Sequence, residues 1–219
     1  MDYGEFRLSR MDDPRFAHLK LLLGWVVYFA LFILTERLIP AEGCTPVHCA
    51  LDDGIPFCEV FVIPYVLWYF LIIGSLLYFA LYSVESFSAL QRRIIIIQML
   101  AVAVYIIFPT RQDLRPLAFE RDNIFTRMVG LIYRADTNTG VCPSLHVALS
   151  IAIGQAWLRE QGVSRAFKAG MTVFCLSICL STVFIKQHSV LDGIAAIPLC
   201  MIAEWWEVYG KNIAQKRPL

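Results

Sequence analysis

The sequence predicts an all-α integral membrane protein, a polytopic bundle of about six transmembrane helices. Of its 219 residues, 58% are hydrophobic and 17% charged, whereas soluble domains are roughly 45–50% apolar and about 25% charged. The apolar excess lies in long uncharged runs, which are typical of membrane spans. Lys and Arg gather between alternate runs, and the net charge of +1 gives no broad basic surface for nucleic acid. The length fits one integral membrane domain, residues 1–219.

Six apolar runs are the predicted spans. Residues 60–82 have no charged side chain and give the clearest of them. A transmembrane helix needs about 20 mostly apolar residues, so the first, third and last runs must take in flanking residues. Aromatic side chains after the last run suit a membrane–water interface. The runs are residues 21–34, 60–82, 94–109, 141–158, 169–185 and 190–203, and the aromatic residues are Trp205, Trp206 and Tyr209.

Four basic clusters predict the orientation. With six crossings they all fall on one side, which the positive-inside rule makes cytoplasmic. Residues 1–20 are then a cytoplasmic N-terminal segment and residues 207–219 a cytoplasmic tail, in the plasma (inner) membrane if the source is bacterial. The loop of residues 39–59 falls outside and has no Lys or Arg. The clusters are Arg7, Arg10, Arg15 and Lys20; Arg92 and Arg93; Arg159, Arg165 and Lys168; and Lys211, Lys216 and Arg217.

The extracytoplasmic loop of residues 110–140 breaks this pattern because it contains five arginines. One interpretation is a solvated or headgroup-contacting loop whose charge is offset by four acidic residues. The other is that some of the arginines bind an anion, because a guanidinium matches phosphate with two parallel N–H donors. The arginines are Arg111, Arg115, Arg121, Arg127 and Arg134, and the acidic residues are Asp113, Glu120, Asp122 and Asp136.

Two histidines lie at or near predicted membrane depth. His146 is near the start of the fourth run and His188 is at the start of the sixth. The chain crosses twice between them, so both share one end of the bundle with the arginine-containing loop. Asp192 follows His188 at a spacing of four residues, which places the two on one face of a helix. A carboxylate there fixes the imidazole tautomer and leaves the other nitrogen free as a nucleophile or base; the alternative is a purely structural hydrogen bond.

Pro143 and Ser144 precede His146 and predict a helix N-terminus. Proline suits the first helical turn, and the exposed N–H groups with the positive end of the dipole favour an anion there. Ser144 adds a hydroxyl donor. The alternative is ordinary helix capping.

These pieces together resemble the type 2 phosphatidic acid phosphatase superfamily of membrane lipid phosphatases and phosphotransferases. Its second motif reads Pro-Ser-Gly-His, as at residues 143–146, and its third ends His-x-x-x-Asp, as at His188 and Asp192. Its first motif ends Arg-Pro, as at Arg115 and Pro116. The resemblance covers roughly residues 108–198, and six spans is the usual architecture of the family.

The sequence departs from the family pattern at three places. Phe108 stands where the first motif has a Lys, and Arg111 is the candidate substitute. Thr182 stands where the third motif has an Arg, and Lys186 is the candidate for the lost charge. Leu145 replaces the Gly of the second motif. The strings at residues 108–110, 142–146 and 186–188 look more like the branch containing inositol phosphorylceramide synthases, which leaves phosphatase and transferase both open.

The resemblance implies a mechanism and a set of site residues. His188 attacks phosphorus to form a phosphohistidine, Asp192 orients its ring, and His146 protonates the leaving alkoxide and then activates water or an alcohol. The phosphate oxygens are expected to be held by Arg115, Arg111, Ser144 and Lys186. No cofactor or metal is expected. The expected partners are a lipid phosphate substrate, membrane lipids and, for a transferase, an alcohol acceptor such as one giving a sphingolipid- or phosphoinositol-type product.

A second class of function stays open. A non-enzymatic transporter could use the His188–Asp192 pair as a proton relay, which needs a polar path through the bundle. The predicted spans show few ionisable residues toward the cytoplasmic side, which disfavours it.

The outer loops carry cysteines and acidic residues with no assigned role. Disulfides are expected on an oxidising side, with pairing undetermined, and a zinc site is a weaker alternative because the spacing fits no strong pattern. The acidic residues predict either a solvated loop face or a headgroup contact. The cysteines are Cys44, Cys49, Cys58 and Cys142, with His48 as a further zinc candidate, and the acidic residues are Asp52, Asp53 and Glu59.

Overall fold

The computed structural model describes residue 13 and residues 16–216, with side chains described as far as residue 210. The described chain is mostly helical, with one parallel pair of two-residue strands. Arg7, Arg10, Arg15 and Arg217 lie outside the described residues, as do the side chains of Lys211 and Lys216. The helices are α1 (Leu23–Leu38), α2 (Ala50–Gly54), α3 (Val62–Tyr82), α4 (Val84–Ile107), α5 (Ile124–Ala135), α6 (Leu145–Arg159), α7 (Arg165–Phe184) and α8 (Val190–Lys216), and the strands are β1 (Thr45–Pro46) and β2 (Thr110–Arg111).

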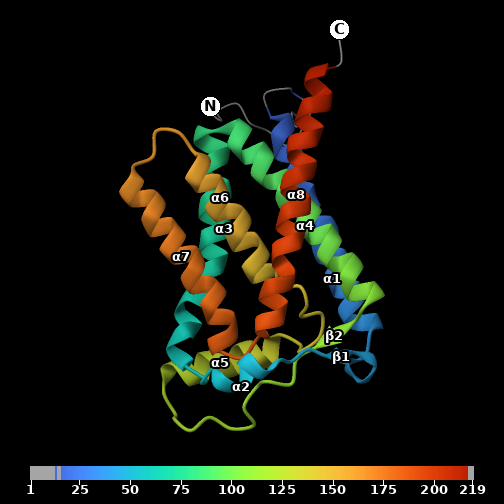
Figure 1. Ribbon diagram of the computed structural model, residues 1–219, viewed down its shortest axis with the longest axis vertical. Helices are drawn as coiled ribbons and strands as arrows, with labels where there is room; N and C mark the ends of the chain where they lie inside the picture. Colours follow the sequence, from blue (N-terminus) through green and yellow to red (C-terminus); the bar gives the residue numbers. More distant parts are fainter. Residues whose placement is uncertain (1–12, 14–15, 217–219) are drawn as a thin grey trace.

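Four segments are long and apolar enough to span a membrane. They are Ala17–Leu38, which contains α1, Glu59–Tyr82, which contains α3, and the helices α4 and α7. The other two predicted spans correspond to α6 and α8, which run beside these helices along the long axis (Figure 1). Helix α6 has 15 residues, or about 22 Å, against a hydrocarbon core of about 30 Å. Helix α8 has 27 residues but carries acidic residues in its middle.

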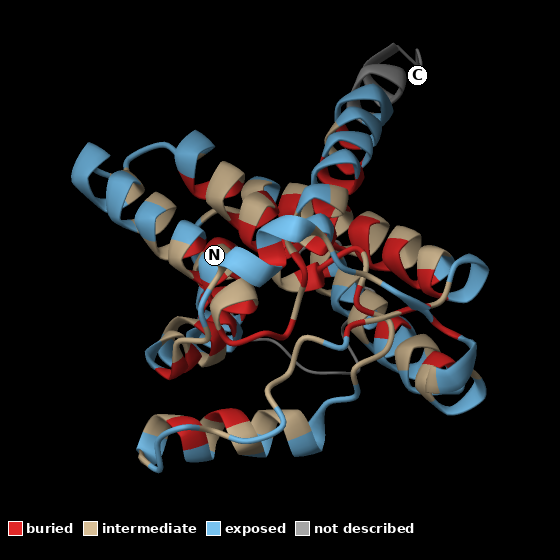
Figure 2. Cartoon of the chain, turned by 60° about the horizontal axis from the view of Figure 1, so that its bottom comes forward, coloured by how far each residue is buried: buried red, intermediate tan, exposed pale blue. Residues whose placement is uncertain are grey.

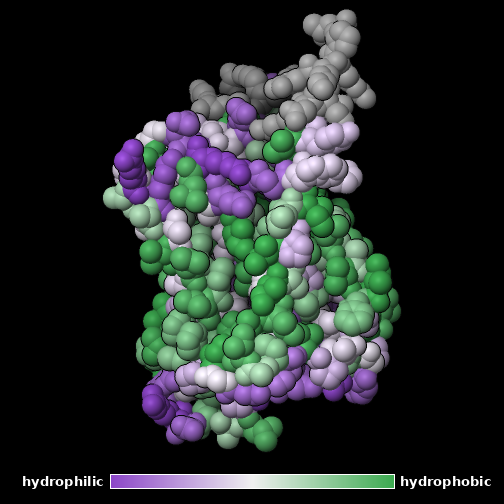
Figure 3. Space-filling model, viewed as in Figure 1, coloured by the Kyte–Doolittle hydropathy of each residue, from purple (hydrophilic) through white to green (hydrophobic). Residues whose placement is uncertain are grey.

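The face of the bundle drawn in Figure 3 is hydrophobic in its middle and hydrophilic toward both ends. Large side chains of α3 and α7, such as Phe70, Ile73 and Val173, are about two-thirds exposed. Large exposed apolar patches on a protein surface mark contact with lipid or another protein. Buried residues gather instead on the helix sides that face the middle of the bundle (Figure 2).

Helix α4 is central to the packing, since it lies against α1, α3, α6 and α8. It begins at Val84, ten residues before the predicted run, so Arg92 and Arg93 lie inside a helix instead of in a connection. Arg93 donates to Glu204 of α8 at 2.9 Å and Arg92 donates to Glu207 at 2.7 Å. The prediction placed these arginines between spans because it treated charge as a break; pairing with α8 is what lets the helix continue.

The predicted loop of residues 110–140 contains a helix that the sequence analysis missed. Helix α5 begins at the N-cap Asn123, whose Oδ1 accepts from the backbone N–H groups of Phe125 and Thr126. Val129 of α5 is buried in one apolar cluster with Val62 and Tyr65 of α3, and α5 also lies against the turn Glu59–Phe61. Helix α5 lies across the end of the bundle where α2 and the two strands also lie (Figure 1).

The Asn123 cap gives a stability prediction. Asn123→Ala removes the α5 cap and a 3.0 Å bond from its side-chain amide to the buried Glu59. We expect a loss of about 1–2 kcal/mol of unfolding free energy, measured by chemical denaturation in detergent. Asp122→Ala, at a neighbouring exposed position, is the matched control and is expected to change stability by less than about 0.5 kcal/mol. Equal losses in the two variants would contradict the capping role.

Candidate functional site

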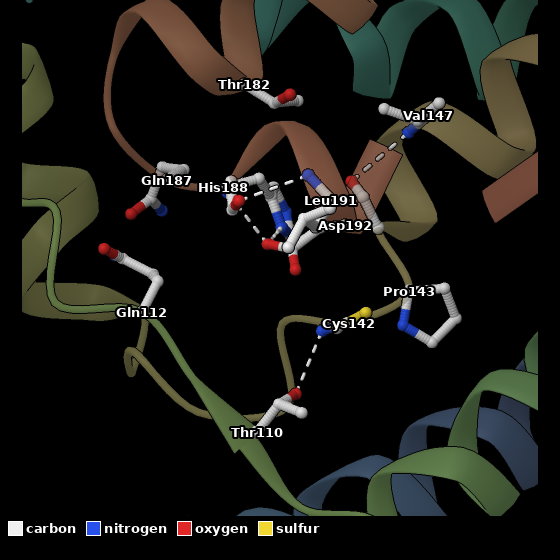
Figure 4. A network of polar contacts seen from close by, with 12 residues as sticks. Thr110, Gln112, Cys142, Pro143, Val147, Thr182, Gln187, His188, Leu191 and Asp192 are labelled. Carbon is white, nitrogen blue, oxygen red and sulfur yellow. Dashed lines mark hydrogen bonds and ion pairs between the residues drawn. The ribbon is translucent and has the colours of Figure 1, made fainter. Parts of the chain in front are cut away.

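The N-termini of α6 and α8 meet at one end of the bundle. The backbone N–H of Ser144, the N-cap of α6, donates to the carbonyl of Asp192 in the first turn of α8 at 3.0 Å. Thr110 of β2 accepts from the backbone N–H of Cys142 at 3.1 Å (Figure 4). These two bonds fix the segment before α6 between β2 and α8, and so place residue 146 beside residue 188.

A tight turn between α7 and α8 carries His188. The backbone N–H groups of Gln187 and His188 both donate to the carbonyl of Thr182. His188 therefore precedes α8, and the prediction that it shares a helical face with Asp192 is wrong in detail. The pair still forms: His188 Nδ1 lies 3.2 Å from Asp192 Oδ2 (Figure 4). Because a carboxylate at this position accepts a hydrogen bond, Nδ1 carries the proton and Nε2 is left with its lone pair.

His146, the second residue of α6, lies between two aromatic rings of α3. Its ring centroid is 4.3 Å from that of Tyr65 and 4.1 Å from that of Trp68. Its Nε2 is buried and has no hydrogen-bond partner among the described residues. The centroids of the His146 and His188 rings are 5.9 Å apart. The structure thus brings the two predicted histidines together and leaves a ring nitrogen of His146 for another group.

Ser144 caps α6, with its Oγ accepting from the N–H of Val147 at 3.5 Å. Pro143 precedes this cap, so the prediction that it occupies the first helical turn is wrong. In the part of the chain that the structure describes, the backbone N–H groups of Leu145 and His146 have no hydrogen-bond acceptor. The positive end of the α6 dipole is therefore open to an anion beside the two histidines.

The N-terminus of α8, by contrast, is already filled by a carboxylate. Asp52, from α2, accepts from Ser189 Oγ at 2.6 Å and from the N–H of Val190 at 2.8 Å. Asp52 is 1% exposed, which corrects the expectation of a solvated or headgroup-contacting loop face for this residue. Glu59 is also buried, and only Asp53 is exposed, where it pairs with His48. A second anion is thereby excluded from the start of α8.

Asp52 gives a pH prediction. Burial raises its pKa, but hydrogen bonds from Ser189, Val190 and Cys49 outweigh the burial and leave the pKa below its ordinary value. A carboxyl with a lowered folded-state pKa stabilises the fold above its unfolded pKa, and this contribution is lost as the pH falls through the folded pKa. We therefore expect Asp52→Asn to flatten the acid-side decline of unfolding free energy, measured at intervals below about pH 5. An unchanged slope would contradict the assignment.

Arg115 lies next to the histidine pair through Gln187. Its Nε donates to Gln187 Oε1 at 2.9 Å, and its two Nη atoms donate to the carbonyls of Tyr133, Asp136 and Thr137. A guanidinium has five N–H groups, so these four bonds leave one N–H, on Nη2, without an acceptor in the described part of the chain. Burial lowers the pKa of Arg115, yet a guanidinium remains protonated at neutral pH.

Arg111 and Lys186 are committed to other partners. Arg111 donates to Asp113 and to the carbonyl of Ala41. Lys186 donates through Nζ to the carbonyls of Asp52 and Ile55, at 2.8 and 2.6 Å. In the described part of the chain no hydrogen bond joins either of these two predicted phosphate ligands to His146, His188 or Asp192, although each keeps at least one N–H group without an acceptor there.

Three site residues were missed by the sequence analysis. Gln187 accepts from Arg115 and donates to Tyr65 and Asp136. Gln112 is fully buried, and its Nε2 has no acceptor among the described residues; its side chain extends toward Gln187 (Figure 4). Asp52 was noted only as a loop acid. Neutral amides give no charge signal in a sequence, and the partners of Asp52 are far away along the chain.

An open groove of about 430 Å³ lies beside the site, with Arg115 in its wall. Both signs of charge and several hydroxyl groups line it, and Glu36 accepts from the hydroxyls of Thr137 and Thr139. The remaining lining residues are Ile39, Pro40, Ala41, Tyr133, Arg134, Ala135, Asp136 and Asn138. The groove meets the site at Arg115 and Asp136, the two lining residues that hydrogen-bond to Gln187.

The described residues contain no group of three or more His, Cys, Asp or Glu side chains placed to hold a metal ion. All seven cysteines are described and none is in a disulfide. No family model, no curated protein sequence and no solved structure matches the chain.

Proposed function

We propose that this chain is a membrane-embedded lipid phosphate phosphatase or phosphotransferase that acts through a phosphohistidine intermediate on His188. The observation that carries the proposal is the arrangement of the two histidines: rings 5.9 Å apart, Asp192 on one nitrogen of His188, and an unpartnered Nε2 on His146. The motif resemblance to type 2 phosphatidic acid phosphatases supports the same chemistry.

The proposed reaction has two steps. His188 Nε2 attacks phosphorus, the bond to the leaving lipid oxygen breaks, and His146 gives that oxygen its proton. His146 then takes a proton from water or an acceptor alcohol, whose oxygen attacks phosphorus and breaks the bond to His188. Asp192 stabilises the positive charge that develops on the imidazole of His188. Water gives a phosphatase, and an alcohol gives a transferase that makes a sphingolipid- or phosphoinositol-type lipid.

The described contacts suggest which groups hold the phosphate oxygens. Several donors have no acceptor among the described residues: the remaining N–H of Arg115, the Nε2 of Gln112, the hydroxyl proton of Ser144 and the N–H groups at the start of α6. Arg111 and Lys186 bind carbonyls with some of their N–H groups, and each keeps at least one N–H without an acceptor among the described residues. Charge stabilisation in this scheme comes from protein groups directed at the transferring phosphoryl.

We propose that all of α1, α3, α4, α6, α7 and α8 cross the membrane, with both termini cytoplasmic and the site at the non-cytoplasmic face. In a variant without native cysteines, Asp53→Cys should react with a membrane-impermeant maleimide added to intact cells. Arg165→Cys, at the start of α7, should react only after the membrane is permeabilised. Both positions are exposed, and the reverse labelling pattern would invert the topology.

The test of the activity is a panel of lipid phosphates supplied to the purified protein in detergent, without added metal and with or without an alcohol acceptor. Released phosphate identifies a phosphatase, and a new phospholipid identifies a transferase. Acid-labile phosphate on the protein, absent in His188→Ala, would identify the intermediate. Neither product from any lipid phosphate would reject the proposal.

A proton-relay transporter is the second candidate, favoured by polar groups in the bundle interior. Gln98 of α4 and Ser150 of α6 are fully buried, and their side-chain polar atoms have no partner among the described residues. The Arg93–Glu204 pair lies farther along α4 and joins it to α8. Proton uptake into liposomes that is lost in both His188→Ala and Gln98→Leu would favour this function over the enzyme.

A further inference from the structure

The short helix α2 and the turn that carries His188 cap each other. Asp52 of α2 accepts at the N-terminus of α8, from Ser189 Oγ and from the N–H of Val190. In the other direction, Lys186 donates to the carbonyls of Asp52 and Ile55 at the C-terminal end of α2. The orphan donors of one helix and the orphan acceptors of the other are thus satisfied by reciprocal contacts.

These contacts flank His188 on both sides. Lys186 is two residues before it and Ser189 is the next residue. Lys186 has a φ of 56°, a left-handed conformation that is uncommon for residues other than glycine. It is held in this conformation by two hydrogen bonds from a largely buried ammonium group. The backbone that carries His188 is therefore held from α2 and not only by its own chain.

The Asp52 side chain is also linked, through Ser189, to the Asp192 carboxylate that orients the His188 imidazole. Asp192 Oδ2 accepts both from His188 Nδ1 and from the N–H of Ser189. Ser189 in turn donates its hydroxyl proton to Asp52. Loss of the Asp52 carboxylate would free the Ser189 hydroxyl and leave the N–H of Val190 without an acceptor, at the residues whose position sets the His188–Asp192 bond.

We propose that Asp52 is a positioning residue for His188: through Ser189 and Val190 it holds the turn so that the His188 ring faces His146 with Nε2 free. Asp52 touches no reacting atom in this role. The kinetic part of this inference rests on the proposed function, whereas the effect on the geometry of His188 does not.

The charged and titratable groups around His188 come from several elements. Asp192 and His146 face it directly, Asp136 acts on it electrostatically from the end of α5, and Arg115 reaches its neighbour Gln187. Asp52 accepts a hydrogen bond from Ser189, the residue that follows His188 in the chain. A change in the titration of His188 in an Asp52 variant therefore has to be compared with a variant that alters charge on α2 without touching the turn.

Asp53 provides that control because it is adjacent, has the same charge and is exposed, with its side chain 69% accessible and paired only with His48. The experiment compares Asp52→Ala, Asp52→Asn and Asp53→Ala in the full chain. The first readout is the titration of the histidine ring carbons by NMR in detergent, with His188 assigned by its absence in His188→Ala. The second is kcat and KM for the lipid phosphate that the panel identifies.

We expect Asp52→Ala to change the titration and ring shifts of His188, and to lower kcat by about 10²-fold with KM little changed. Asp52→Asn, which keeps an oxygen acceptor for Val190, should restore part of both readouts. Asp53→Ala should match the wild-type protein. If Asp52→Ala does not fold, Ser189→Ala removes one bond of the same contact, together with the bond that Ser189 Oγ accepts from the N–H of Leu191, and should shift His188 in the same direction.

Two results would overturn the inference. One is an unchanged His188 titration in Asp52→Ala or, failing that, in Ser189→Ala. The other is an equal change in Asp53→Ala, which would reduce the effect to general charge. A wild-type protein that transfers no phosphate from any lipid would reject the proposed function alone, because the NMR comparison would still decide whether Asp52 positions His188.

Discussion

Replacing His188 by Ala is expected to abolish phosphoryl transfer, lowering kcat by about 10⁴-fold or more, as for the loss of a covalent nucleophile. The variant lacks the proposed nucleophile, and no other ring nitrogen is held by Asp192 in the described structure. His188 is the histidine whose Nδ1 is held by Asp192, so its Nε2 is the nitrogen that can bond to phosphorus. Steady-state kinetics measure the loss of turnover, and the amount of acid-labile phosphate on the protein measures the loss of the phosphohistidine.

The matched control is His48→Ala. His48 is exposed and pairs with Asp53, and we expect the His48→Ala variant to retain wild-type kinetics. His146→Gln is informative in a different way: it removes the acid and base but leaves the nucleophile, so a slow reaction with accumulation of phosphohistidine is expected. Undiminished activity in His188→Ala would reject the nucleophile assignment even if the lipid activity is real.

The second large effect is expected at the opposite end of the bundle. Glu204→Ala leaves Arg93, whose side chain is 5% exposed, with Gln155 as its remaining side-chain partner, at 3.5 Å. Removing one partner of a buried ion pair typically costs about 3–5 kcal/mol, because the other charge stays buried without compensation. We expect a loss of that order in unfolding free energy, measured by denaturant titration in micelles.

Two further variants distinguish the loss of an ion pair with Glu204 from the cost of leaving the Arg93 charge buried without a partner. Arg159→Ala removes the exposed partner of Glu204, at 2.7 Å, and should cost less than about 1 kcal/mol. The double variant Arg93→Leu with Glu204→Leu removes both charges and should recover most of the stability lost in Glu204→Ala. A double variant as unstable as the single one would show that the pair is not what sets the stability of this region.

The features of the fold that could be predicted were those that depend on local hydrophobicity. Helix α3 coincides almost fully with the predicted run of residues 60–82, because the whole helix lacks charged side chains and its exposed and buried positions are mostly apolar. The proximity of His146 and His188 followed from counting crossings between them. Helix α4 was predicted too short, since the acceptors that neutralise Arg92 and Arg93 belong to α8 and give no signal near them in the sequence.

The side-chain partners in the site could not be predicted because they are set by tertiary contacts. Arg111, Arg115 and Lys186 were identified as cations, but a sequence does not tell whether a cation will meet a ligand or a backbone carbonyl. In the structure, carbonyls of Ala41, Tyr133 and Ile55 take up much of their hydrogen-bonding capacity. Helix α5 had a local signal, an Asn cap followed by apolar residues at helical spacing, which the number of arginines obscured.

The bond between Asp52 and Ser189 joins residues separated by 137 positions along the chain. Because a chain is made from its N-terminus, Asp52 is synthesised long before Ser189. In the proposed topology the segment that carries Asp52 would be exported first, and its carboxylate would stay hydrated until α7 and α8 are inserted. The contact that is proposed to position His188 would then form last, and a chain that ends before α7 would lack one half of it.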